Sequence, residues 1–399
     1  MFNRSFQKFA AAVTTAALLA TSAYAADVIK LGAIAPKTGG LAGGAVVTQW
    51  PNVQLWVEQV NARGGLDVGG KMMTIELIEY DDKTNPGEHI KLAQRLATQD
   101  KVDFVVAPYG TGFNIATAPI YGKFGYPMIA VSAITDKMDE LTARYPNLFF
   151  TLGTTTAFVQ GVTEILVEQR AAGAIGNEVA MVNVADAFGI ELADRARDLF
   201  AAEGFEIVYD KSYPLGTPDL SPVMKGVKAS GAKAFIAWSY PPDSFGLAEQ
   251  AIIEDLDVNV YYSAVATSFP AFSDVYGSKI NNVLGAGGTN VDEPVIADYR
   301  KAHLEITGKV ADYWASANTY AALQILEQSI VGAATLDRAK VTQYIKDNTF
   351  TTVMGDLSFK NNFSNTFWSV GQWQDGVFRG VKGSNVDGAV NVRLKDGWK

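Results

Sequence analysis

The chain contains no cysteine and only two histidines among its 399 residues. Without cysteine, disulfides, thiol nucleophiles and thiolate metal sites are excluded, and no cysteine can carry a lipid anchor. His89 and His303 lie far apart on predicted helices, and no Gly-x-Ser-x-Gly elbow or cluster of metal ligands accompanies them. We therefore expect no catalytic residue, no metal and no cofactor, with both histidines solvated or partly buried.

Long apolar runs are also missing after the N-terminus. Arg4 and Lys8 precede an apolar stretch at residues 9–20, and Ala23-Tyr-Ala25 provides small residues for cleavage. This pattern is typical of a secretory signal peptide over residues 1–25, and its apolar part is too short for a membrane anchor. Since no later segment is long and apolar enough to cross a membrane, we expect a soluble protein of the bacterial periplasm.

Basic residues are outnumbered by acidic ones. The chain has 33 Lys and Arg against 42 Asp and Glu, a net charge of −9, which becomes about −11 without the signal peptide. A spread acidic charge argues against nucleic acid or an anionic membrane surface as the partner. The length is sufficient for two domains.

Short apolar strands alternate with helical segments twice along the chain, up to about residue 154 and again from about residue 155. Such alternation predicts parallel, doubly wound α/β sheets, and its repetition predicts two similar lobes. In the second series we expect strands over residues 178–183, 206–213, 234–238 and 258–262. The tail from about residue 355 alternates like antiparallel strands, with turns at 361–362 and 375–376.

Residues 103–135 contain two strand ends rich in Gly, Ser and Thr, separated by a helical segment. The carboxyl ends of parallel strands meet at one sheet edge, where open α/β sheets bind ligands. Thr111 and Asn114 lie where the helix begins, so backbone N–H groups and a hydroxyl can face a carboxylate together. The alternative is that Thr111 only caps the helix.

Several short motifs occur in a specific order and spacing: Val28-Ile-Lys-Leu-Gly-Ala, Thr38-Gly-Gly, Val60-Asn-Ala-Arg-Gly-Gly65, Tyr80-Asp-Asp, Ala321-Ala-Leu and Thr352-Val-Met-Gly-Asp-Leu357. On these motifs the chain resembles the leucine/isoleucine/valine-binding periplasmic proteins of ABC importers, from about residue 27 to about residue 380. The resemblance implies the α/β, type I periplasmic-binding fold, in which two doubly wound α/β lobes are joined by three hinge crossings. We expect these crossings near residues 151–154, 286–289 and 353–358.

The resemblance also implies an organisation and partners. The N-terminal lobe would comprise residues 27–151 and 288–353, and the C-terminal lobe residues 152–287 and 354–399. The expected function is capture of a small carboxylate ligand by hinge closure and delivery to an ABC permease in the inner membrane, by a monomer. A ligand-sensing module for a membrane receptor is the alternative, and an exported hydrolase is a more remote rival because no catalytic histidine is available.

Ligand-binding residues can be carried over where the motifs match. The first lobe would bind the ligand carboxylate through the loops that follow two of its strands, and the second lobe would cover the ligand with aromatic side chains. The implied residues are Tyr109, Gly110, Thr111, Ala133, Thr135, Phe188, Tyr240 and Ala264. The aromatic residues among them could equally pack the lobes together.

Two departures from the family pattern bear on the ligand. Amino-acid binders have an acidic residue near the position of Ala264, and without it an ammonium group would be buried unpaired. Residues 43–45, Gly-Gly-Ala, replace a bulky aromatic residue and should open volume. Both favour a hydrophobic or aromatic acid without an obligatory amine. Asp186 or Asp243 could still pair with an ammonium, so amino acids remain a second possibility. Further aromatic residues near strand ends add to the expected lining: Trp50, Phe113, Trp238, Tyr262 and Phe269.

Overall fold

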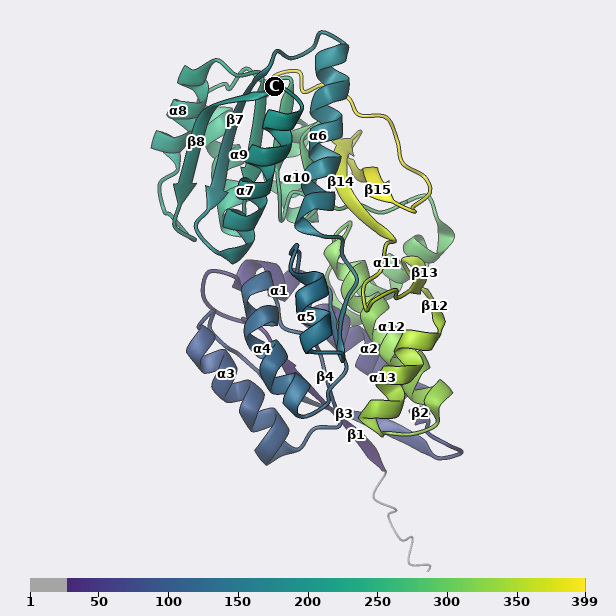
Figure 1. Cartoon of the computed structure of the whole chain (residues 1–399). Helices are drawn as coiled ribbons and strands as arrows, with labels where there is room; N and C mark the ends of the chain where they lie inside the picture. Colours follow the sequence, from purple (N-terminus) through teal and green to yellow (C-terminus); the bar gives the residue numbers. More distant parts are fainter. Residues whose placement is uncertain (1–26, 399) are drawn as a thin grey trace, which may run out of the picture.

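The computed structural model describes residues 27–398. These residues form two α/β lobes, one above the other in Figure 1, each built around parallel strands. The signal peptide predicted for residues 1–25 lies outside the described residues. Among residues 27–398, no helix combines the length and apolar character needed to cross a membrane.

The first lobe is organised around a four-stranded sheet and a separate parallel pair. In spatial order the sheet contains β2 (Leu66–Asp67), β3 (Met72–Tyr80), β1 (Val28–Ile34) and β4 (Phe104–Val105), and the pair is β5 (Met128–Ala130) with β6 (Leu148–Phe150). Only β2 is antiparallel to its neighbour. The loop after the carboxyl end of β4 faces the second lobe, since a Cβ on Gly110 would lie 3.7 Å from the Tyr240 hydroxyl.

Helices cover the first-lobe strands. They are α1 (Ala42–Thr48), α2 (Trp50–Ala62), α3 (Pro86–Arg95), α4 (Thr111–Lys123), α5 (Met138–Arg144), α11 (Pro294–Thr307), α12 (Ala315–Ala333) and α13 (Arg338–Asp347). The two helices that follow the second lobe in sequence, α11 and α12, pack on α2 and so return to the first lobe. A π-helical turn, η1 (Leu96–Asp100), continues α3.

The second lobe contains one seven-stranded sheet. Its strands in spatial order are β15 (Val377–Ser384), β14 (Phe367–Gln374), β11 (Leu284–Ala286), β10 (Val260–Ser263), β9 (Ala234–Trp238), β7 (Glu178–Val184) and β8 (Glu206–Tyr213). Strands β7 to β11 are parallel, while β14 and β15 form an antiparallel hairpin. The associated helices are α6 (Thr155–Ala171), α7 (Ala187–Ala202), α8 (Ser221–Ser230), α9 (Pro241–Ile253), α10 (Pro270–Tyr276) and the 3₁₀ turn η2 (Gly277–Ile280).

The chain passes between the lobes after β6 and again after β11. The second passage requires glycine, because Gly287 and Gly288 have φ angles of 81° and 142°. A Cβ on Gly287 would also lie 2.0 Å from the ring of Trp314. A Cβ on Gly288 would lie 2.6 Å from the Cα of Gly380. This connection is consequently fixed in shape by close packing.

The last passage lies later than the predicted 353–358. That stretch instead forms the turn and second strand of a hairpin, β12 (Thr349–Thr352) with β13 (Gly355–Ser358). Phe363 still bridges Phe150 of the first lobe, and the chain joins the seven-stranded sheet only at Phe367. The C-terminal segment of the second lobe therefore begins after residue 363 rather than at 354, because backbone pairing holds the intervening residues to the first lobe.

Candidate functional site

The two loops predicted to hold the ligand lie together at the carboxyl ends of β4 and β5. The Gly110 N–H donates to Ser132 Oγ at 3.0 Å, and Ser132 Oγ donates to the Pro108 carbonyl at 3.0 Å. The Ile134 N–H donates to Thr111 Oγ1 at 3.2 Å. These bonds connect both loops into one surface, which forms the first-lobe wall of the junction between the lobes.

The N-terminus of α4 opens onto this surface. Its N-cap is Gly110, with φ 95°, so no side chain caps the helix, and its first turn contains no acidic residue. Thr111 is the first helical residue and does not act as a cap, so the alternative role considered for it is wrong. The N–H groups of a first turn have no partner within the helix, and the helix dipole favours an anion beside them.

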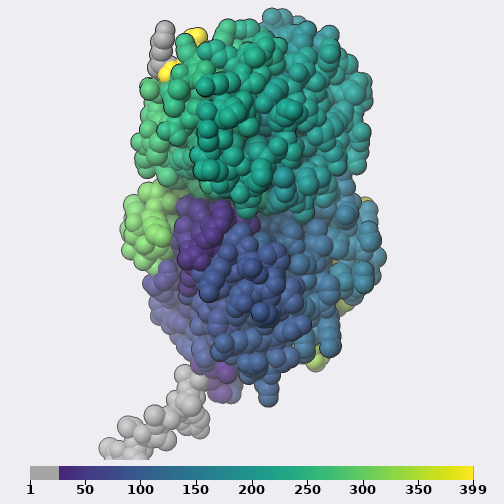
Figure 2. Space-filling model, turned by 90° about the vertical axis from the view of Figure 1, so that its left-hand side faces the viewer, coloured from purple at the N-terminus to yellow at the C-terminus, as the bar shows by residue number. Residues whose placement is uncertain are grey.

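Helices of the second lobe begin opposite this wall. The start of α7 faces α4, since a Cβ on Gly112 would lie 3.9 Å from Ala187 Cβ. The start of α9 faces α1, since a Cβ on Gly43 would lie 3.8 Å from Pro241 Cβ. Figure 2 shows the purple residues of the first lobe lying directly against the teal residues of the second.

Phe188 and Tyr240 form an aromatic wall on the second lobe. Their rings stack with centroids 4.8 Å apart and an interplanar angle of 28°, and both side chains are buried. The Tyr240 hydroxyl reaches across the junction, because a Cβ on Gly110 would lie 3.7 Å from it. Burial raises the pKa of the Tyr240 hydroxyl far above its usual value, and nearby Asp186 adds to the effect. Tyr240 is therefore a neutral group at this wall.

Acidic side chains occupy the starts of α7 and α9. Asp186 accepts the Gly189 N–H at 2.9 Å and caps α7. Asp243 Oδ1 accepts the Gly216 N–H at 3.3 Å, whereas its buried Oδ2 has no hydrogen-bond partner. Burial raises the pKa of Asp243 to about 6 and raises that of Asp186 as well. The second-lobe helices thus carry their own carboxyl groups, while α4 carries none.

The position of Ala264 contains no acidic group. Its N–H donates to the Ala237 carbonyl at 2.9 Å and lies 3.2 Å from Ser239 Oγ. Ser239 and Ser244 hydroxyls are 2.7 Å apart beside it. Because Ala264 offers only a buried methyl group, this part of the second lobe can contribute hydroxyls and apolar surface but no charge.

Ala133 and Thr135 differ in their surroundings. The Ala133 side chain is buried in the first-lobe core. Thr135 Oγ1 lies 3.0 Å from both carboxylate oxygens of Glu191, a second-lobe residue that the sequence reasoning missed. A signal was present, since Glu191 follows Phe188 by three positions in a helix and shares its face.

The volume expected beside residues 43–45 is occupied by the protein. A Cβ on Gly44 would lie 1.9 Å from the Tyr109 hydroxyl oxygen and 2.4 Å from its Cζ. The ring of Tyr109 fills the space that a side chain at position 44 would need, so the expectation of open volume is wrong. The glycine brings Tyr109 and α1 into contact.

The paired acids after β3 shape the first loop. Asp81 accepts the Lys37 N–H at 2.9 Å and the Thr38 hydroxyl at 2.8 Å. Asp82 lies 2.8 Å from His89 Nδ1. Both acids therefore serve turn and helix geometry. His89 and His303 are fully buried rather than solvated or partly buried, because each imidazole has a local polar partner and packs in a core.

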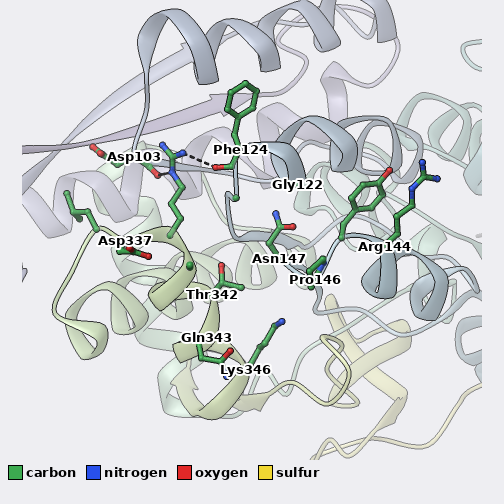
Figure 3. Close-up of a pocket in the computed structure, with 15 residues that line it drawn as sticks. Asp103, Gly122, Phe124, Arg144, Pro146, Asn147, Asp337, Thr342, Gln343 and Lys346 are labelled. Carbon is green, nitrogen blue, oxygen red and sulfur yellow. Dashed lines mark hydrogen bonds between the residues drawn. The ribbon is translucent and has the colours of Figure 1, made fainter.

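A separate cavity of about 730 Å³ lies on the first lobe, away from the junction (Figure 3). Asp103, Asn147 and Thr342 are among its lining residues. Arg338 also lines it and donates to the carbonyls of Asp103 at 2.8 Å and Phe124 at 3.0 Å. This arginine attaches α13 to the start of β4 and the end of α4 and is a structural group.

The chain is similar in sequence to proteins of a known family. A model described as periplasmic binding protein matches residues 28–376. Leu/Ile/Val-binding protein homolog 7 of Brucella suis biovar 1 is 27% identical over 253 residues, which are 61% of this chain and 60% of that protein. The chain therefore aligns with about 60% of the length of this curated relative.

Solved structures of binding proteins share the fold. LivJ, the branched-chain amino acid transporter substrate-binding protein of Streptococcus pneumoniae, crystallised with isoleucine, gives a TM-score of 0.76 at 22% identity, covering 88% of this chain and 98% of LivJ. An ABC transporter solute-binding protein of R. palustris, in complex with 4-hydroxybenzoate, gives 0.72 at 23% identity, covering 94% and 98%. The predicted α/β fold is confirmed, and the matched proteins are solute-binding proteins rather than enzymes.

Proposed function

The chain belongs to the periplasmic binding protein family and has its type I fold, and from this premise we propose that it is a monomeric, periplasmic solute receptor of an ABC importer of the branched-chain amino acid type. It would capture a small carboxylate between its lobes and present it to a permease in the inner membrane. The proposed binding residues are Tyr109, Gly110, Thr111, Ala133, Thr135, Phe188, Tyr240 and Ala264.

The uncapped start of α4 is the observation that supports an anionic ligand. It lies beside the connected loops that contain Gly110 and Thr111, and it has no acidic residue of its own. A ligand carboxylate at this point would accept first-turn N–H groups and gain from the helix dipole. The corresponding helices of the second lobe already carry Asp186 and Asp243. A ligand carboxylate should therefore bind the first lobe, and the other end of the ligand should face the second lobe.

Closure of the two lobes would complete the site. The carboxylate meets the first lobe, and Phe188 and Tyr240 then cover the rest of the ligand. A ligand stabilises the closed form only through the contacts that this form adds. Micromolar affinity, about −8 kcal/mol, is within reach of a small buried ligand with a few directed hydrogen bonds.

The first candidate ligand is a hydrophobic or aromatic acid. Ala264 supplies no partner for an ammonium group, while Phe188 and Tyr240 offer stacked rings for an aromatic body. The R. palustris protein of the same fold was crystallised with 4-hydroxybenzoate. A phenolic hydroxyl could donate to a carboxylate of the second lobe.

The second candidate is an α-amino acid, and Asp243 is the observation in its favour. Asp243 lies in the first turn of α9, whose N-cap residue is Tyr240, and its buried Oδ2 has no hydrogen-bond partner. A ligand ammonium there would supply both charge and hydrogen bonds. LivJ, which has the same fold, was crystallised with isoleucine.

A panel of ligands distinguishes the candidates. Thermal shift followed by calorimetry would compare leucine, phenylalanine, 4-hydroxybenzoate and cinnamate on the wild type and on Asp243→Asn. Asp194→Asn is the control, because Asp194 lies on the outside of α7 and pairs with Arg197. We expect the aromatic acids to bind the wild type and the amino acids to fail. Binding of leucine alone, abolished by Asp243→Asn, would establish the second candidate, and no binding by any acid would refute the proposed function.

A further inference from the structure

A carboxylate of the second lobe is bound by groups from both sides of the first passage between the lobes. Glu191 Oε1 accepts the Asp136 N–H at 2.6 Å and the hydroxyls of Thr135 and Thr155, each at 3.0 Å. Thr135 and Asp136 follow β5 in the first lobe, whereas Thr155 begins α6 in the second. Glu191 therefore connects the two lobes directly.

An ion pair one helical turn further along α7 makes a second connection. Arg195 Nε and Nη2 each lie 3.0 Å from Asp136 Oδ2. The same carboxylate accepts the N–H and the hydroxyl of Thr156 at 2.8 Å each. Glu191 and Arg195 are four positions apart in α7, so they lie on one face and bind consecutive residues of the same first-lobe loop.

All of these contacts join protein groups, so they form without a ligand. Charge-assisted hydrogen bonds are stronger than neutral ones, and here both the Glu191 carboxylate and the Arg195–Asp136 pair are partly shielded from solvent. Separation of the lobes would break the contacts of α7 with residues 135 and 136. The contacts of Thr155 and Thr156 lie next to the passage itself and would move least.

We propose that Glu191 and Arg195 form a clasp that holds the two lobes closed before a solute binds. The clasp favours the closed form by interactions that do not depend on the solute, so a substantial part of the solute-free population is already closed. Thr135, one of the proposed ligand contacts, is committed to Glu191 in that form. A solute that used the Thr135 hydroxyl would have to compete with this carboxylate.

Distance measurements between the lobes test the clasp without any solute. The chain has no natural cysteine, so Gln94→Cys on α3 and Lys225→Cys on α8 would give a unique pair of spin labels. Both helices lie on the side of the molecule away from β12–β15 in Figure 1. We expect rotation of the lobes about the passages that connect them to change the distance between these two helices. Double electron–electron resonance would then report closed and open populations.

Glu191→Ala is the first variant, and Arg195→Met is the second in case the first folds poorly. Each should raise the ratio of long to short distances roughly tenfold, the effect expected from losing a set of bonds to a charged group. Asp194→Asn, on the same helix but paired within the second lobe, should leave the distribution unchanged. Wild-type distributions in both folded variants would overturn the clasp. That outcome would not affect the proposed function, which the ligand panel tests separately.

Discussion

Replacement of Gly44 by alanine tests how tightly Tyr109 is packed at the junction. The added Cβ would lie 1.9 Å from the tyrosine oxygen, 2.4 Å from Cζ and 2.9 Å from Cε1. Non-bonded carbon and oxygen atoms do not approach so closely, and Tyr109 is only 5% exposed. The ring must therefore move, and with it the surface that it forms beside α4.

The expected cost follows from two opposing terms. Alanine in place of glycine within a helix contributes up to about 1 kcal/mol of stability. Overpacking of a buried site typically costs about 1–3 kcal/mol. Because the clash involves a rigid ring rather than the end of a flexible chain, we expect a net loss of about 1–2 kcal/mol in the free energy of unfolding.

Gly43 provides a matched control in the same helix. A Cβ there would have its nearest neighbour, Pro241 Cβ, at 3.8 Å, an ordinary contact. Gly43→Ala should therefore stabilise the protein by about 0.5–1 kcal/mol. Urea unfolding, followed by circular dichroism and tryptophan fluorescence, would measure both variants.

A Tyr109→Ala background completes this experiment. Removing the ring should abolish most of the cost of Gly44→Ala, because the two residues interact directly. Equal stability changes at positions 43 and 44, or an unchanged cost in the Tyr109→Ala background, would refute the packing described here.

Further predictions concern binding, pH and the first-lobe core. Thr111→Ala should weaken binding of the best carboxylate by about 1–3 kcal/mol while Thr111→Ser retains it, as measured by calorimetry, and equal affinities would remove Thr111 from the site. Burial raises the pKa of Asp312 to about 6, so the protonated form is favoured in the folded state and the associated stability is lost as pH rises through about 6. The free energy of unfolding of Asp312→Asn should accordingly rise relative to that of the wild type by up to about 3 kcal/mol between about pH 4 and pH 7, as measured by urea titrations. A difference between the two proteins that does not change with pH would contradict this. Arg338→Met should lower the free energy of unfolding by about 1–3 kcal/mol, since it leaves partly buried carbonyls without donors, and a loss below about 0.5 kcal/mol would contradict that role.

Strands β7 and β9 of the second lobe could be predicted from the sequence because they are buried almost throughout and appear as nearly continuous apolar runs. Strand β8 lies at the edge of the sheet with mostly exposed side chains and does not have this pattern. The predicted ranges 178–183, 206–213 and 234–238 agree with β7, β8 and β9 to within one residue. The turn at Asp375 and Gly376 was also predicted correctly, and both residues have positive φ. The local sequence pattern is sufficient to predict these strands and this turn, because contacts with distant residues do not change their backbone conformation.

Features that depend on distant partners could not be predicted. The third passage is displaced because Phe363 bridges Phe150, a contact without a local signature. The sequence does not show that the space beside Gly44 is filled, because Tyr109, which fills it, is distant in the chain. Glu191 shares a helix face with Phe188, but its contact with the loop at residues 135–136 depends on the packing of the two lobes, which has no local signature.

A crystal structure with the acid that gives the largest thermal shift would test the central claim most directly. We predict that its carboxylate lies within hydrogen-bonding distance of Thr111 and the first turn of α4, with its apolar body against Phe188 and Tyr240. An acid bound outside the junction of the lobes, or oriented with its carboxylate toward Asp243, would contradict the account.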